Sequence, residues 1–161
     1  MRARTILFAA LAALAACSPM AADAGQQAST SAPARHSESG LEVVPLTIVS
    51  ANGRHPLRVE VARSGAEQAK GMMFRTAMGA NEGMIFPMEP ARQASFWMKN
   101  TVIPLDLVFI GPDRRIESIA ANAVPYSLSP ISSQGAVAAV LELNGGRAAQ
   151  LGLAPGDRVE W

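Results

Sequence analysis

The chain has 161 residues, of which 14 are basic and 13 acidic, so its formal net charge is +1. This near balance, without a basic face that stands out, gives no indication of a nucleic-acid partner. The only cysteine is Cys17, so a domain downstream of it has no disulfide, no thiol nucleophile and no thiolate metal ligand.

The N-terminus has the pattern of a secretory signal peptide. Arg2 and Arg4 precede an apolar stretch over residues 6–16. This stretch is about half as long as the roughly 20 residues that a permanent membrane helix needs. We therefore expect residues 1–16 to be a signal peptide.

The apolar stretch ends in Leu-Ala-Ala-Cys at positions 14–17, which resembles a bacterial lipobox. In that motif the cysteine is lipidated and becomes the first mature residue, so Cys17 is the expected lipidation site and a lipid membrane an expected partner. Ser18 favours the periplasmic face of the outer membrane in a cell with two membranes. The alternative is an ordinary signal peptide cleaved after Ala22 or Ala24, with Cys17 discarded.

Residues 17–40 are poor in large apolar side chains and rich in Ala, Ser, Gln, Gly and Pro. Such a segment cannot bury enough surface to offset the entropy of ordering, so it predicts a flexible tether. Its removal up to about Ser39 is expected to leave stability unchanged. Residues 41–161 are long enough for one domain with a single core and too short for two.

The first part of this domain predicts a β-hairpin. Residues 42–49 and 56–62 are β-rich and flank Asn52-Gly53, a dipeptide that readily adopts the positive φ angles of hairpin turns. In the second run apolar residues alternate with Arg58 and Glu60, which predicts a strand with one face toward water.

A short helix is expected over residues 64–70. Ser64 and Glu67 have the spacing of a capping box, in which each side chain bonds to the backbone amide of the other residue. Gly71 suits the end of this helix, because glycine readily adopts the backbone conformation found there.

Turn-forming residues separate the later runs that predict strands, at residues 83–87, 93–98, 105–110, 115–120, 137–143 and 157–161. The Ser- and Pro-rich tract 126–135 predicts a loop, and residues 144–150 predict one or two helical turns ended by Gly152. Many short strands with few helical residues indicate a mostly β fold, a compact single-domain β-sandwich or barrel-like sheet with one or two short helices.

Five blocks of this region resemble, in order, the hallmark motifs of the family called domain of unknown function 192 (DUF192). They are residues 71–75 (GMMFR), 83–86 (GMIF), 96–106 (FWMKNTVIPLD), 141–146 (LELNGG) and 155–157 (PGD). The sequence departs from the usual motifs of the family at Met73 and at the Gly145-Gly146 pair. The resemblance covers essentially all of residues 41–161. It implies a compact, mostly β fold that is common in bacteria and often follows a signal sequence, without an established activity and without a catalytic assignment.

Asp106 opens a strand whose other residues are apolar on both faces. A carboxylate there needs hydrogen bonds or an ion pair to offset the cost of desolvation. The structural interpretation is that Asp106 accepts backbone amides of the 99–103 loop. The functional alternative is a pocket carboxylate with a perturbed pKa.

Glu142 repeats this pattern, because Ala138 and Val140 share its face of the predicted strand. Arg75 and Lys99 could supply the opposite charges, in an Arg75–Glu142 or a Lys99–Asp106 ion pair. Such a pair would either stabilise the fold or bind an anionic ligand. Two carboxylates are also the minimum for acid/base work on a glycosidic bond, so a small envelope enzyme that uses Asp106 and Glu142 is an alternative function.

Six of the eight methionines lie between positions 72 and 98. In an exported protein a thioether cluster can bind Cu(I), which gives a third hypothesis. Packing in the core is the preferred interpretation, because no tight methionine repeat lies near a histidine. His36 and His55 have no second imidazole at ligand spacing, so no zinc site is predicted. The six are Met72, Met73, Met78, Met84, Met88 and Met98.

Phe96 and Trp97 are neighbours on a predicted strand, so one ring points into the core and the other outward. An outward aromatic ring beside Lys99 and Asn100 is typical of a recognition surface for a sugar or a peptide. The alternative is that the 126–135 loop covers this ring.

The function predicted from these residues is that of a non-enzymatic envelope lipoprotein module, which binds a small molecule or an envelope protein. No cofactor and no metal are predicted. The candidate ligand-binding residues are Arg75, Trp97, Lys99, Asn100, Asp106 and Glu142.

Overall fold

The computed structural model describes residues 34–161. The expected signal peptide, Cys17 and most of the expected tether lie outside these residues. In the part of the chain that is described, no helix is long and apolar enough to cross a membrane.

The expected N-terminal hairpin is confirmed. Strands β1 (Val43–Ser50) and β2 (Gly53–Val61) run antiparallel, with Ser50 opposite Gly53. Gly53 has a φ of 122°, which a residue without a Cβ adopts at little steric cost. The short C-terminal strand β7 (Arg158–Glu160) pairs with the free edge of β1.

The expected helix is also confirmed, as α1 (Gly65–Lys70). Ser64 caps it, since its hydroxyl accepts the amide of Glu67 while the Glu67 carboxylate accepts the amide of Ser64 at 2.7 Å. Gly71 ends the helix at a φ of 46° and donates its amide to the Glu67 carbonyl.

The two strands expected at 83–87 and 93–98 are one bent strand, β3 (Glu82–Phe96). The break expected between them is not formed, although Pro90 lies there. Instead, the register with β6 shifts between Pro87 and Arg92, where a proline needs no ladder partner. Residues before and after the bend therefore belong to one wall of the molecule.

Strand β4 (Leu105–Ile110) has its expected bounds, and β5 (Ile116–Ala123) continues three residues beyond the predicted strand. The loop expected at 126–135 is wrong from residue 131, because β6 (Ile131–Asn144) begins there. Ser133 explains how a polar tract joins the sheet, since its buried hydroxyl accepts the amide of Ala94 at 3.0 Å. The helical turns expected after β6 form α2 (Arg147–Leu151), which Gly152 ends.

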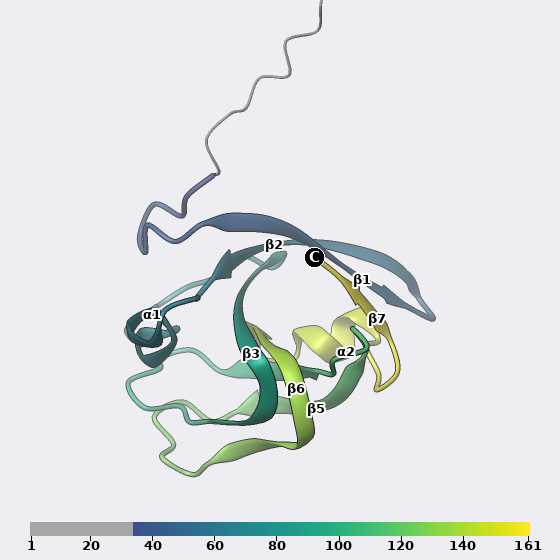
Figure 1. Ribbon diagram of the computed structural model, residues 1–161. Helices are drawn as coiled ribbons and strands as arrows, with labels where there is room; N and C mark the ends of the chain where they lie inside the picture. The colour runs from purple at the N-terminus through teal and green to yellow at the C-terminus, as the bar shows by residue number, and fades with distance from the viewer. Residues whose placement is uncertain (1–33) are drawn as a thin grey trace, which may run out of the picture. The chain divides into compact units, whose positions relative to one another are not determined.

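The seven strands form one curled sheet in the order β5-β4-β6-β3-β2-β1-β7, in which only β2 and β3 are parallel neighbours. Figure 1 shows the curl, from the β1–β2 ribbon across the top to β5 at the bottom. Two clusters of buried side chains cover its two faces, one around Ile48, Ile85 and Leu141, the other around Phe86 and Phe109. The fold is thus mostly β, a half-barrel with two short helices, as the strand pattern predicted.

Candidate functional site

The two carboxylates predicted to share a site lie on opposite faces of the sheet. In the pairing of β4 with β6, Asp106 is opposite Leu143, and Leu107 is opposite Glu142. Directly paired residues point to the same side of a sheet. Leu143 belongs to one core cluster and Leu107 to the other, so Asp106 and Glu142 face different cores and cannot act together as an acid/base pair.

Asp106 is fully buried and binds backbone amides, although not those of the expected 99–103 loop. Its Oδ1 accepts from Asn122 at 2.8 Å and from Gly146 at 2.9 Å, and its Oδ2 accepts from Ala148 at 2.8 Å. These bonds fix the end of β5 against the start of α2. The expected Lys99–Asp106 pair is not formed, and Asp106 has a structural role.

Glu142 is buried without a comparable set of partners. Its Oε2 has no hydrogen-bond partner among the described residues, and burial raises the pKa of this carboxyl to about 8. Met84 of β3 and Leu107 of β4 flank it on the sheet. Since an unsatisfied buried polar group costs about 1–3 kcal/mol, this arrangement asks for an explanation.

Glu142 lines a pocket of about 270 Å³, which we call the Glu142 pocket. Of the six residues predicted for the site, Trp97, Lys99 and Glu142 line it, whereas Arg75, Asn100 and Asp106 do not. Sequence reasoning missed the polar side chains that α1 and β3 contribute, because only the folded chain brings them to Glu142. The other polar or charged residues that line the pocket are Gln68, Lys70, Arg92, Gln93, Ser95 and Thr101.

The aromatic pair at the end of β3 divides as its alternation predicted. Phe96 turns inward, where its ring lies 5.1 Å from that of Phe86 in an edge-on arrangement. Trp97 is 51% exposed, and the Lys99 ammonium lies 5.1 Å from the centre of its ring. The 126–135 segment contributes Leu128 and Pro130 to a small groove beside Trp97 but does not cover the ring.

Asn100 joins three loops instead of lining the pocket. Its carbonyl accepts the amide of Phe74, while the neighbouring Thr101 carbonyl accepts the amide of Tyr126. Asn100, Phe74 and Tyr126 all have left-handed backbones, with φ angles of 53°, 65° and 62°. The bonded loops place the exposed rings of Phe74 and Tyr126 on the same end of the sheet as Trp97.

Arg75 pairs with Glu60 and not with Glu142. Its Nη2 lies 2.7 Å from Glu60 Oε2, and both side chains are 6% exposed. Met84 lies between the two glutamates in the sheet, because it is paired with Glu142 of β6 on one side and with Glu60 of β2 on the other. Two strand spacings, about 10 Å, therefore separate the two glutamates.

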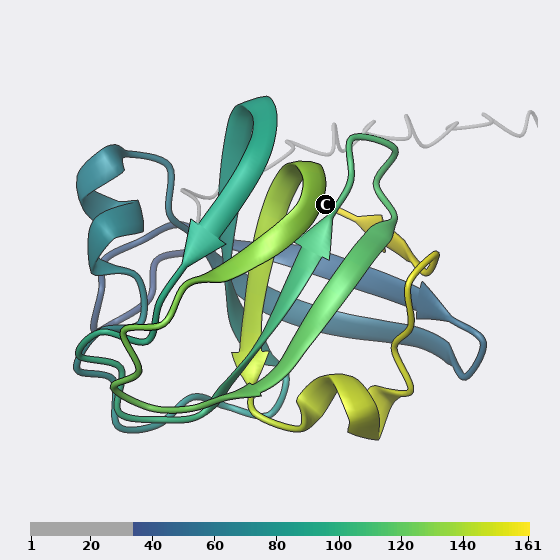
Figure 2. The ribbon, with the colours of Figure 1, turned by 90° about the horizontal axis from the view of Figure 1, so that it is seen from below.

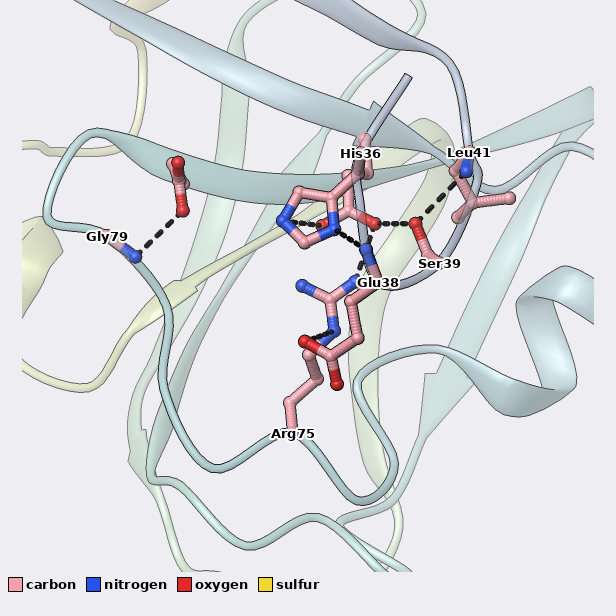
Figure 3. A network of polar contacts seen from close by, with 8 residues as sticks. His36, Glu38, Ser39, Leu41, Arg75 and Gly79 are labelled. Carbon is pink, nitrogen blue, oxygen red and sulfur yellow. Dashed lines mark hydrogen bonds and ion pairs between the residues drawn. The ribbon is translucent and has the colours of Figure 1, made fainter.

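Glu60 was expected to face water, together with Arg58, and this expectation is wrong. Only 4% of Glu60 is exposed. Besides Arg75, its carboxylate accepts the Ser39 hydroxyl, and His36 Nε2 lies 3.7 Å away (Figure 3). The strand pattern could not reveal this, since the covering residues come from other parts of the chain.

The covering segment is residues 34–40, which the composition assigned to the tether. Val43 donates its amide to Ala34 at 2.7 Å, and Gly40 donates to His36 at 2.8 Å. Glu38 adds an ion pair with Arg75 at 3.5 Å (Figure 3). The domain boundary at residue 40 is thus too late, and residues 34–40 belong to the folded unit.

A protein that begins at Leu41 is therefore expected to be less stable than one that begins at Ala34. It lacks the Ser39 hydroxyl bond to Glu60 and the Glu38 contact, and the loss should be about 1–3 kcal/mol. Urea unfolding of the two proteins measures it. Ser39→Ala in the longer protein should reproduce part of the loss, and equal midpoints for all three would contradict the packing of this segment.

We expect Glu142 to make the domain less stable as the pH rises. The folded carboxyl keeps its proton to about pH 8, whereas the unfolded one loses it near 4.5. The stability that the protonated Glu142 contributes is thus fully present below pH 4.5. It is lost as the pH rises to about 8, by at most about 1.4 kcal/mol per pH unit. Glu142→Gln should remove this decline and exceed the parent in stability above pH 8. Unfolding curves across pH test this, with exposed Glu89→Gln as the control; a decline unchanged by Glu142→Gln would contradict it.

The methionines lie mostly in the core. Met72, Met84, Met88 and Met98 belong to the cluster that includes Phe86 and are at most 5% exposed. This confirms the packing interpretation for those four. Copper binding stays a hypothesis.

The DUF192 family, described as Uncharacterized ACR, matches residues 47–161, so the chain belongs to this family. No curated protein matches the chain. The chain is 58% identical in sequence to a protein of unknown function from Novosphingobium aromaticivorans DSM 12444. The crystal structure of that protein matches this fold with a TM-score of 0.79, and the match covers 82% of this chain and 94% of that chain. A second protein, from Sinorhizobium meliloti 1021, provisionally described as a transcription regulator, is 41% identical, with a TM-score of 0.73, over 74% of this chain and 94% of that one.

Proposed function

We propose that this domain is a non-enzymatic module that binds a small molecule in the Glu142 pocket. The observation that carries the proposal is Glu142, whose buried Oε2 has no partner among residues 34–161 and whose side chain lines an open pocket. A ligand with a hydrogen-bond acceptor would satisfy the protonated carboxyl. Apolar walls with a few convergent polar groups are the usual composition of such sites.

The enzyme alternative has less support. It needs two carboxylates on one cavity, and the oxygens of Asp106 are occupied by three amides on the other face of the sheet. Glu142 alone could donate a proton, but no second carboxylate of the described part of the chain lines its pocket.

Regulation of transcription, which the Sinorhizobium relative suggests, also has less support. Without Arg2, Arg4 and Asp23, the chain has 12 basic and 12 acidic residues. A DNA-binding surface depends on a local excess of basic residues, and many of the arginines here are paired with carboxylates.

A fragment screen by thermal shift tests the binding proposal, since a ligand of the folded state raises the melting temperature. We expect hits that stabilise the parent and the Glu89→Gln control but lose most of their effect in Glu142→Leu, whose side chain offers no hydrogen-bond donor. Chemical-shift mapping should place these hits at Met72, Phe86 and Trp97. Hits that stabilise all three proteins equally, or none at all, would contradict a site over Glu142.

We propose further that the protein is exported and anchored by a lipid on Cys17. The support is the lipobox-like run at residues 14–17 behind a short apolar stretch. Cys17→Ser is then expected to move the protein from the membrane fraction of the producing cell to the soluble fraction. Immunoblots of the two fractions measure this, and a variant that stays with the membranes as the parent does would contradict the anchor.

A further inference from the structure

Three basic side chains surround the Glu142 pocket, and each comes from a different element. Lys70 ends α1, Arg92 lies at the bend of β3, and Lys99 follows Trp97 in the next loop. All three are exposed, and none forms an ion pair within residues 34–161. By contrast, Arg54, Arg63 and Arg75 are each paired with a carboxylate.

Among residues 34–161, Glu142 is the only acidic residue that lines the pocket. Its proton is retained at neutral pH, because burial raises its pKa to about 8. The pocket therefore has a cationic rim and a neutral hydrogen-bond donor, with no negative charge to balance the rim. Such a potential attracts an anion and repels an amine.

Shape and wall chemistry narrow the class of ligand. A volume of about 270 Å³ equals that of roughly nine water molecules in the liquid, which fits one ring with its substituents or a short chain. Part of the lining is apolar, and an inorganic ion alone would make no favourable contact with that part. It is formed by Met72, Phe86, Met88 and Phe96.

We propose, on the basis of the binding function above, that the ligand is a small organic anion, a carboxylate or a phosphate monoester. Its charged group lies between Lys70, Arg92 and Lys99, its apolar body lies against Met72 and Phe86, and an acceptor atom takes a hydrogen bond from the Glu142 carboxyl.

The groups that face Glu142 also predict the direction of a pH effect. From the elements around it come Lys70 of α1, Arg92 and Met84 of β3, Leu107 of β4 and Lys99 of the loop. Two further acidic residues lie on this face of the sheet: Glu82, which accepts the amide of Gly79 at 2.9 Å, and Glu60, which is paired with Arg75. Ionisation of Glu142 adds a negative charge to the pocket and offsets part of the attraction of the cationic rim, so affinity for an anion should fall as the pH rises past 8.

Matched fragments test the inference. The probes are 3-phenylpropionate and phenyl phosphate, with neutral 3-phenylpropanamide and cationic 3-phenylpropylamine as comparisons, titrated at neutral pH and low salt while protein amide shifts are recorded. We expect at least one anion to bind at least about tenfold more tightly than the amide, and the amine to bind least. The two anionic probes distinguish a carboxylate from a phosphate ligand.

Variants assign the charge to the rim. Arg92→Gln combined with Lys99→Gln should weaken the anion at least about fivefold and leave the amide unchanged, because only the anion depends on the cations. Arg54→Gln, which removes a positive charge at the far end of β2, is the control. It should change neither the affinity for the anion nor the affinity for the amide. In Glu142→Gln, the loss of anion affinity above pH 8 should disappear.

The outcomes separate this inference from the binding function. If the amide or the amine binds at Glu142 and the anions bind no better, the anionic class is wrong and the pocket still binds a ligand. If the anions bind but Arg54→Gln weakens them as much as the rim variants do, the rim assignment is wrong. If no probe shifts the pocket amides at millimolar concentration, both proposals are overturned.

Discussion

Arg75→Met is expected to lower the free energy of unfolding by about 3–5 kcal/mol, because it leaves the Glu60 carboxylate buried without its cation. The Ser39 hydroxyl would remain bonded to Glu60, but a hydroxyl carries no positive charge that could replace the guanidinium. Denaturant unfolding at neutral pH measures the effect. We expect it to be the largest single-residue effect of any polar contact described above.

The double variant Arg75→Met with Glu60→Leu is the matched control. Removing both members of a buried pair usually costs far less than removing one, so most of the loss should be recovered. If the double variant were as unstable as the single one, the loss would come from the packing of the Arg75 side chain and not from an orphaned charge.

Asp106→Asn is expected to destabilise the domain by about 2–4 kcal/mol. An amide group can keep one oxygen toward some of the three backbone N–H groups, but its NH₂ then faces the others, donor against donor. Hydrogen exchange should also accelerate at Gly146 and Ala148, where α2 loses its anchor. Glu142→Gln lies on the opposite sheet face and should leave those two amides protected.

Asp113→Asn provides the control for this substitution. Asp113 accepts one backbone amide, that of Arg115 at 3.1 Å, in an exposed turn. Its replacement should cost less than about 1 kcal/mol. An Asp106→Asn protein as stable as this control would show that Asp106 does not hold β5 and α2 together.

Local structure followed from the sequence because its causes are local. The capping box of α1 lies within four consecutive residues, and the β1–β2 turn lies within residues 50–53, with Gly53 at a positive φ and the Asn52 amide bonded to the Ser50 hydroxyl. The failures have long-range causes. Pro90 and the serines at 132 and 133 resemble breaks in isolation, yet β3 and β6 include them because each strand supplies the other with partners.

The site was predictable in part for the same reason. A carboxylate among apolar neighbours marked Glu142 and Asp106 as buried, and both are. The sheet face on which each carboxylate lies was not predictable. If the pairing of β4 with β6 were shifted by one residue, Asp106 and Glu142 would lie on the same face of the sheet. Arg75 illustrates the same limit, since its place in the sequence does not show which buried glutamate it meets, and the folded chain pairs it with Glu60.

The left-handed residues of the three bonded loops have a thermodynamic consequence. A non-glycine residue in this region of backbone space costs about 1 kcal/mol or more, and an aromatic side chain gains none of the local hydrogen bonds that asparagine can form there. Phe74 and Tyr126 nevertheless stand at such positions, and these two residues are 65% and 60% exposed. The loop after α1, which contains Phe74, and the loop after β5, which contains Tyr126, lie beside the loop after β3 at the left of Figure 2. The fold would be more stable with asparagine at both positions, so these two loops keep their aromatic rings at the expense of conformational stability.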